Sequence, residues 1–288
     1  MLDAKFDKYE SSPYVKMLFM GDTGAGKTGA TVALAAAGYN VHNLDLEAGT
    51  DIIADFILNP TSMYRRALPG LWTQAQADSI QQRYDFVSIS ETMKKSKTEK
   101  GTKVFGAGDG WNKVIAQLEN WTDGENSYGP VESWTPKDVL VIDSLTKLTK
   151  FAFRFQLAMN GRLFTRPEQN DIYQAQILVE ALIENLCSVQ IPCHVVINCH
   201  IKYLEAGAML RGFPETIGKA LSPTLGRHFN HTLLARTSGQ KEALTRKIIT
   251  TTTGAIDLKS TAPLRVKAEY ELKTGLAEYF RDVTGGEK

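Results

Sequence analysis

One stretch of eight residues constrains this chain more than any other. Residues 21–28 read Gly-Asp-Thr-Gly-Ala-Gly-Lys-Thr and match the pattern G-x-x-x-x-G-K-[ST]. Glycines in such a loop accept positive φ angles, so the backbone can approach an anion and surround phosphate oxygens with N–H groups. In this pattern the lysine, Lys27, reaches the β- and γ-phosphates, and the hydroxyl of Thr28 ligates Mg²⁺. The residues expected to bind ATP are Gly21, Asp22, Thr23, Gly24, Ala25, Gly26, Lys27, Thr28 and Gly29.

The segments on either side of this loop strengthen the prediction. Residues 14–20 form an apolar run of strand length, and residues 29–37 are rich in alanine and end at Gly38, which can cap a helix. A strand, a glycine loop and a helix in this order aim a helix N-terminus at a phosphate. The simpler alternative, a flexible glycine turn without a ligand, does not require this arrangement.

Strand-like and helical segments alternate along the rest of the chain. The further strand candidates are residues 40–46, 84–90, 139–142, 193–198, 232–236, 247–252 and 265–270, and the helix candidates are residues 51–58, 111–121, 145–159 and 171–189. This alternation predicts an α/β fold with a mostly parallel central sheet and helices on both faces. The last three strands predict a C-terminal β extension.

We expect one ATPase domain over residues 14–288, preceded by a short arm at residues 1–13. Residues 91–110 are polar, rich in lysine and then in glycine, which predicts a mobile loop. We therefore expect residues 91–135 to form a mobile insertion. The lysines at 94–103 are either a solvated surface or a contact with nucleic acid. The stretch 203–228 contains glycine and proline, and we expect a long loop there.

The bulk properties exclude some classes of protein. The 288 residues carry a net charge of +1, so nothing global indicates a nucleic-acid or membrane partner. Cys187, Cys193 and Cys199 lie in apolar segments, which favours reduced thiols in a reducing cytoplasm. We find neither a signal peptide nor an apolar span of 18 residues, so we expect a cytoplasmic protein without a membrane anchor.

Three polar residues follow apolar runs of strand type. Asp143 ends the run 139–142, where a carboxylate can hold the Mg²⁺ shell. Glu47 follows the second strand and is our candidate for the base that polarises the attacking water; the alternative is a solvated acid or a cap for the helix near Asp51. His200 follows residues 193–198 and can sense the γ-phosphate, unless it is an ordinary hydrogen-bonded histidine.

Taken together, these motifs resemble a known family. Residues 21–28, 44–47, 139–144 and 197–202 have the order and spacing of the RecA-type recombinase ATPase core. In particular, the chain resembles the short, core-only RecA-like ATPases of bacteriophages that are linked to single-strand annealing. The resemblance covers about residues 14–270 and is strongest at the motifs.

This resemblance implies roles for individual residues. Glu47 would be the catalytic glutamate, and His200 stands where RecA proteins carry a glutamine. Lys259 would reach the γ-phosphate of a neighbouring subunit, although Thr261 replaces a second lysine of RecA. The two loops facing DNA would be residues 153–170 and 203–226. The expected DNA-binding residues are Arg162, Arg166, Lys202, Tyr203, Arg211, Phe213 and Lys219.

The family also implies partners. The protein would bind single-stranded DNA, form a ring or filament with ATP between subunits, and work with an annealing or single-strand-binding protein in the cytoplasm of a bacterial host. Two alternatives remain open. A small-molecule phosphotransferase would need an arginine-rich lid, and residues 91–135 contain no arginine. The other alternative is an ATP-dependent assembly switch that does not hydrolyse ATP. In the ATPase, Glu47→Gln should abolish hydrolysis and keep ATP binding, whereas in the switch it should change nothing.

Overall fold

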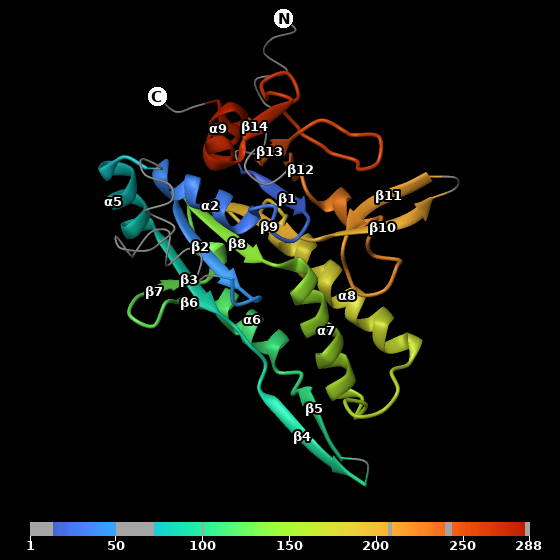
Figure 1. The fold of residues 1–288 in the computed structure, drawn as a ribbon. Coiled ribbons are helices and arrows are strands. Elements are labelled where there is room, and N and C mark those ends of the chain that lie inside the picture. The colour runs from blue at the N-terminus through green and yellow to red at the C-terminus, as the bar shows by residue number, and fades with distance from the viewer. Residues whose placement is uncertain (1–13, 50–71, 100, 207–208, 240–243, 286–288) are drawn as a thin grey trace, which may run out of the picture.

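A computed structural model describes residues 14–49, 72–99, 101–206, 209–239 and 244–285. Its centre is an eight-stranded sheet in the order β14-β13-β12-β1-β9-β8-β2-β3 (Figure 1). The strands are β1 (Lys16–Gly21), β2 (Asn40–Asp45), β3 (Tyr84–Ser88), β8 (Asp138–Asp143), β9 (His194–Cys199), β12 (His231–Ser238), β13 (Thr245–Ile249) and β14 (Glu269–Glu271). The six strands from β12 to β3 are parallel, and β13 and β14 add an antiparallel edge. The predicted α/β class and C-terminal β extension are confirmed.

Helices cover both faces of the sheet. The helices α2 (Lys27–Ala36), α5 (Gln74–Arg83) and α9 (Leu272–Thr284) lie on one face, and α6 (Gly110–Glu119), α7 (Leu145–Met159) and α8 (Gln169–Leu186) lie on the other (Figure 1). Strand β1 shows the reason: its side chains alternate between the two cores, with Met17 and Phe19 in one and Leu18 and Met20 in the other. A strand buried on both faces reads as a continuous apolar run.

Residues 91–135 differ from the expected mobile insertion. The strands β4 (Met93–Thr98) and β5 (Gly101–Gly106) form an antiparallel hairpin, and α6 follows. After α6 come the short pair β6 (Trp121–Thr122) and β7 (Ser127–Gly129) and a 3-10 turn, η1 (Val131–Ser133). Three tryptophans of this region, Trp111, Trp121 and Trp134, are buried in the core. The expectation of a loop at 91–110 was wrong because lysine-rich strands carry little hydrophobic signal.

The stretch 203–228 is also more regular than expected. The strands β10 (Ile201–Ala206) and β11 (Met209–Pro214) form a second hairpin, followed by the 3-10 turn η2 (Leu225–His228). In Figure 1 this hairpin projects from the sheet next to α8. Residues 201–206 and 209–214 therefore form a pair of strands and not a loop.

Two of the helices in the described residues were not predicted. Helix α5 begins at a capping box of Thr73 and Gln76 but buries only Ile80, so it lacks an apolar face. Helix α9 buries Leu276, Tyr279 and Phe280 against α2 and the edge of the sheet. The helix expected at residues 51–58 and the arm at residues 1–13 lie outside the described residues.

Candidate nucleotide site

The glycine loop connects β1 to α2 in a shape suited to an anion. Gly24 and Gly26 have φ angles of 77° and 90°, in the left-handed region that glycine tolerates. Gly26 is the N-cap of α2 and gives it no side-chain cap, so the first N–H groups of the helix remain available for a ligand. A Cβ atom on Gly26 would lie 2.5 Å from a methyl carbon of Leu272, so this side chain would have to shift in addition to the strain from the positive φ angle.

Lys27 is folded onto the loop. Its ammonium donates hydrogen bonds to the carbonyl oxygens of Gly21 (2.7 Å) and Asp22 (3.1 Å). Burial lowers the pKa of Lys27, and the nearby carboxylate of Asp143 acts in the opposite direction. Phosphate oxygens could replace the two carbonyls as acceptors without moving the side chain out of the loop.

Thr28 and Asp143 form the candidate metal position. The Thr28 hydroxyl donates to Oδ2 of Asp143 over 2.5 Å, although the residues are 115 positions apart. Burial raises the pKa of Asp143, while the side chains of Thr28 and Asn198 favour its charged form. Hydroxyl and carboxylate oxygens suit a hard cation such as Mg²⁺, and a dication would offset the burial of the carboxylate. The residues therefore fit the predicted ion.

A tight turn after β2 presents Glu47. The carboxylate of Asp45 accepts hydrogen bonds from the backbone N–H groups of Glu47 (3.0 Å) and Gly49 (3.2 Å). Between them Ala48 has a φ angle of 57°, an uncommon conformation for a residue with a Cβ atom. This turn sets the side chain of Glu47 beside the carboxyl end of β8.

Both oxygens of the Glu47 carboxylate have partners. Oε1 accepts from the hydroxyl of Ser144 at 2.5 Å, and Oε2 lies 3.3 Å from Nε2 of His200. The hydrogen bond from His200 is the largest influence on the pKa of Glu47. It outweighs burial, which acts in the opposite direction, and the pKa falls to about 2. At neutral pH this side chain is an ionised acceptor, held by two elements besides its own turn.

His200 connects this carboxylate to the second hairpin. It follows β9 directly and precedes β10, and its backbone N–H donates to Oγ1 of Thr146 on α7 at 3.2 Å. The side chain that touches Glu47 is thus one residue from the start of the hairpin. A shift of Glu47 can be passed to β10 through this contact.

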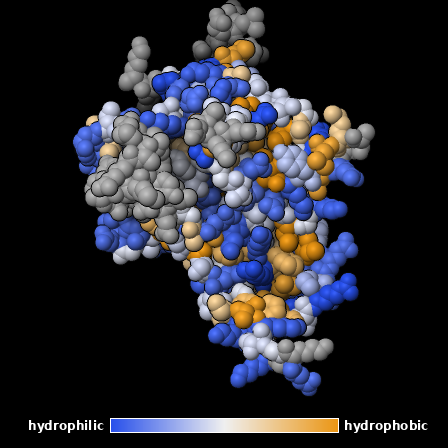
Figure 2. Space-filling model, in the orientation of Figure 1, coloured by the Kyte–Doolittle hydropathy of each residue, from blue (hydrophilic) through white to orange (hydrophobic). Residues whose placement is uncertain are grey.

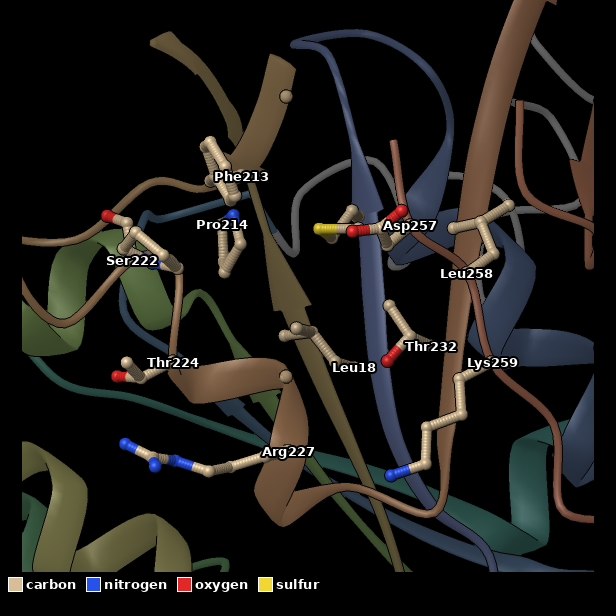
Figure 3. Close-up of a pocket in the computed structure, with 14 residues that line it drawn as sticks. Leu18, Phe213, Pro214, Ser222, Thr224, Arg227, Thr232, Asp257, Leu258 and Lys259 are labelled. Carbon is tan, nitrogen blue, oxygen red and sulfur yellow. The ribbon is translucent and has the colours of Figure 1, made fainter. Parts of the chain in front are cut away.

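Lys259 lies away from these residues. It lines a separate pocket of about 400 Å³, and its ammonium donates to the carbonyl oxygen of Phe229 at 2.6 Å. In the view of Figure 3, Lys259 and Arg227 lie at one end of the pocket and Phe213 at the other. The structure therefore brings Lys27, Thr28, Glu47, Asp143 and His200 together and leaves Lys259 apart.

Arg162 differs from the other expected DNA contacts. Its guanidinium donates to both carboxylate oxygens of Asp171, which is fully buried at the start of α8. Asn160 donates to the same carboxylate at 2.8 Å. Arg162 therefore joins the α7–α8 connection to α8. The sequence could not show this, because a buried acid nine residues away has no local signature.

The remaining expected DNA contacts lie on β10, on β11 and in two connecting segments. Tyr203 on β10 is 46% exposed, and Arg211 on β11 pairs with Asp257 at 2.5 Å. Lys202 is half-buried on β10, and Phe213 lines the pocket of Figure 3. Arg166 and Lys219 are exposed.

Sequence reasoning missed two polar residues at the site. Ser144, the partner of Glu47, also caps α7 by accepting from the N–H of Lys147. Asn198 is the penultimate residue of β9, the strand between β1 and β8, and is fully buried beside Asp143. The available signal was a polar residue at the end of each buried strand.

Comparisons with known proteins give distant structural likenesses only. No family model matches the chain, and no curated protein matches it. A crystal structure of the RadB recombinase is 13% identical, with a TM-score of 0.44, over 95% of this chain and 94% of that one. A KaiC-like protein from the archaeon Pyrococcus horikoshii is 11% identical, with a TM-score of 0.38, over 82% and 77% of the two chains. An ATPase of a bacterial type III secretion system is 10% identical, with a TM-score of 0.36, over 77% and 52%.

The cysteines and the helices bear on two further expectations. Cys187, Cys193 and Cys199 are all free thiols, as expected from their apolar surroundings. Among the described residues, the helices are too short or too polar to cross a bilayer.

Proposed function

We propose that this protein is an Mg²⁺-dependent ATPase of the RecA type. The observation that carries the proposal is the convergence of three units at the carboxyl ends of neighbouring parallel strands. These are the uncapped glycine loop with Lys27, the Thr28–Asp143 oxygen pair, and the Glu47 carboxylate held by Ser144 and His200. Ligands of open α/β sheets bind at this edge.

The chemistry follows from the charges of these groups. The loop N–H groups and Lys27 bind the phosphates and neutralise charge that develops on them. Mg²⁺, when held by Thr28 and Asp143, would add further neutralisation of the β- and γ-phosphates. Glu47 orients a water whose oxygen forms the new bond to the γ-phosphorus as the bond to ADP breaks. The proton of that water passes to Glu47 and then to solvent.

We further propose that the ATPase acts on single-stranded DNA in phage recombination or annealing. Support comes from the family resemblance of the motifs and from the β10–β11 hairpin, which exposes Tyr203 for stacking and starts one residue after His200. Lys259 lies outside the site of its own chain, so its phosphate contact would be with a neighbouring subunit in a ring or filament. An annealing or single-strand-binding protein is the proposed partner.

One observation favours a second candidate, a small-molecule phosphotransferase. A pocket of about 580 Å³ lies between the Glu47 turn and the root of the β4–β5 hairpin, and Lys147 and Arg154 line it. The arginine that residues 91–135 lack is therefore supplied by α7. A phosphate acceptor in this pocket would lie beside Glu47, which could take its proton.

Steady-state ATP hydrolysis with and without single-stranded DNA separates these functions. We expect hydrolysis that DNA stimulates severalfold and that Lys27→Ala abolishes. Hydrolysis that depends on Lys27 and is indifferent to DNA would contradict the recombinase function and favour the phosphotransferase. ATP binding without turnover would contradict the DNA-dependent ATPase and favour the assembly switch.

A further inference from the structure

The β4–β5 hairpin is a projecting arm with two different faces. Its strands have six residues each, which makes the arm about 20 Å long, and it extends away from the sheet (Figure 1). Paired residues of an antiparallel hairpin share a face. The pairing Lys95–Val104 and Lys97–Thr102 defines one face, and Lys94–Phe105 and Ser96–Lys103 define the other. We call the first the outer face, consisting of Met93, Lys95, Lys97, Thr102 and Val104, and the second the inner face.

The two faces have different surroundings. On the inner face, the ring of Phe105 packs edge-on against Phe164 of the α7–α8 connection, with ring centres 4.9 Å apart. On the outer face, Met93 and Val104 are 65% and 52% exposed, and both lysines are exposed. Figure 2 shows hydrophobic and hydrophilic residues side by side on this projection. In the described part of the chain, the outer face is therefore largely open to solvent, and Met93 and Val104 also line the pocket beside the Glu47 turn.

The lysines of the arm differ from three lysines elsewhere in the described residues that have carboxylate partners. Lys113, Lys247 and Lys267 each have a carboxylate within 2.9 Å. Between described residues, no ion pair involves Lys94, Lys95, Lys97 or Lys103. Four ammonium groups on twelve strand residues repel one another. This repulsion is unfavourable, and binding of an external polyanion would reduce it.

The root of the arm is fixed to the body of the protein. Glu91 is ion-paired with Arg154 of α7, and the backbone N–H and hydroxyl of Thr92 donate to Asp109 at 3.1 and 2.6 Å. A Cβ atom on Gly108 would lie 2.7 Å from the carbonyl oxygen of Arg154, which shows how closely the root packs on α7. The lysines are thus presented in a defined direction and not on a loose loop.

The chemistry of the outer face selects its partner. Lys95 and Lys97 are two residues apart on one strand, so their stems are separated by about 6.8 Å. That separation is close to the distance between successive phosphates of an extended single strand. Met93 and Val104 beside them offer apolar area for sugars or bases. We propose that the outer face of the β4–β5 arm binds the sugar–phosphate backbone of single-stranded nucleic acid.

The arm is joined to the catalytic turn. The N–H of Ile89 donates to the carbonyl oxygen of Asp45 at 2.9 Å, and the Ser88 hydroxyl donates to the carboxylate of Asp45 at 3.1 Å. Asp45 also forms the turn that carries Glu47. The segment that leads from β3 into the arm is therefore bonded to the turn that positions the candidate base. This inference rests on the proposed DNA-dependent ATPase and adds a second DNA contact to it.

The test compares two double charge reversals. Lys95→Glu/Lys97→Glu alters the outer face, and Lys137→Glu/Lys273→Glu makes the same change of charge at two exposed lysines remote from the arm. Anisotropy of a labelled oligothymidylate is measured over a series of salt concentrations, and ATP hydrolysis is measured without DNA. Thermal melting confirms that both variants fold.

We expect the outer-face variant to bind at least tenfold more weakly, with its salt slope reduced by about 1.4, since each lost phosphate contact on a single strand removes about 0.7. The remote variant should bind within twofold of the wild type, and hydrolysis without DNA should be unchanged in both. Equal losses in the two variants, or none in either, would overturn the inference while leaving the ATPase intact. Wild-type protein that does not bind the oligonucleotide would overturn the proposed function itself. Binding to phosphatidylserine vesicles that depends on Lys95 and Lys97, with DNA binding unaffected, would assign the arm to a membrane surface.

Discussion

The hydroxyl of Ser144 donates to Oε1 of Glu47 over 2.5 Å, although 97 residues separate them in the chain. With His200 on the other oxygen, the carboxylate is oriented by the ends of β8 and β9 as well as by its own turn. These contacts and nearby positive charge hold the pKa of Glu47 near 2, with the His200 hydrogen bond contributing most. Such a carboxylate orients a water strongly but takes its proton only late in the reaction.

Replacing Ser144 with alanine tests this arrangement. We expect kcat for ATP to fall about tenfold, because a hydrogen bond to a charged group contributes about 1.5–3 kcal/mol and part of it is retained through His200. The KM for ATP should change little. Ser144 also caps α7, so Thr73→Ala, which removes the cap of α5 far from the site, is the matched control. An unchanged kcat in Ser144→Ala would contradict the positioning role.

Replacing Asp143 with asparagine should separate stability from function. The raised pKa of Asp143, caused by burial, means that its ionised form destabilises the free protein above the unfolded pKa of about 4. Asp143→Asn should therefore raise the melting temperature at pH 7 without ligand, and it should remove Mg²⁺-dependent hydrolysis. Calorimetric melting of the ligand-free proteins measures the first effect, and ATP hydrolysis with and without Mg²⁺ measures the second. A lower melting temperature of the ligand-free variant would contradict this account.

His42 lies at the end of the sheet opposite the candidate site. Its surroundings predict that the stability of the fold depends on pH. Burial lowers the pKa of His42, but hydrogen bonds and charge from Asp138 and Asp85, the latter 2.5 Å away, outweigh it and raise the pKa overall. Trp121, Tyr128 and Trp134 pack around the ring. A raised histidine pKa stabilises the fold fully below the unfolded value of about 6.5, and this contribution is lost as pH rises through the folded pKa.

Urea denaturation at pH values from 6 to 9 checks this prediction. Wild-type stability should decline over that range by more than that of His42→Gln. His194 and His231 are the matched contrast, because burial lowers the pKa of each to about 4, and their contributions are constant above pH 6.5. Parallel curves for wild type and His42→Gln would show that His42 is neutral in the folded protein.

Arg162 and Arg166 lie four residues apart and should behave differently. Arg162→Gln removes the partner of the buried Asp171, so we expect a clearly lower melting temperature and a folded fraction that binds DNA normally. Arg166 is exposed, so Arg166→Gln should leave melting unchanged and weaken oligonucleotide binding. Melting curves and anisotropy on both variants decide this. Unchanged melting and weaker oligonucleotide binding in Arg162→Gln, with the opposite results in Arg166→Gln, would restore Arg162 as a DNA contact.

The strands that carry the site were predictable because each is a buried parallel strand. An apolar run followed by a polar residue identified the ends of β2, β8 and β9, and with them Glu47, Asp143 and His200. Their mutual contacts were not predictable, since the Ser144–Glu47 pair depends on the order of strands in the sheet. That order is a tertiary property without a local pattern.

The arm and the outer helices show the opposite case. Lys94 to Lys97 read as a solvated loop, because the strand they form takes its stability from pairing with β5 and not from a core. Helix α5 was missed because Ile80 alone is buried, and its capping box was the only local signal. Elements without an apolar face are the ones that sequence periodicity does not detect.

The most direct test of the central claim is to measure ATP binding and a single turnover of hydrolysis in Glu47→Gln beside the wild type. The amide keeps the size of the side chain and an acceptor for Ser144, but it cannot take a proton from water. We predict ATP binding within about threefold of the wild type and a hydrolysis rate at least 100-fold lower, as general base catalysis contributes about 10²–10⁴. Hydrolysis by Glu47→Gln at the wild-type rate would contradict the assignment of Glu47 and of this site as the ATPase centre.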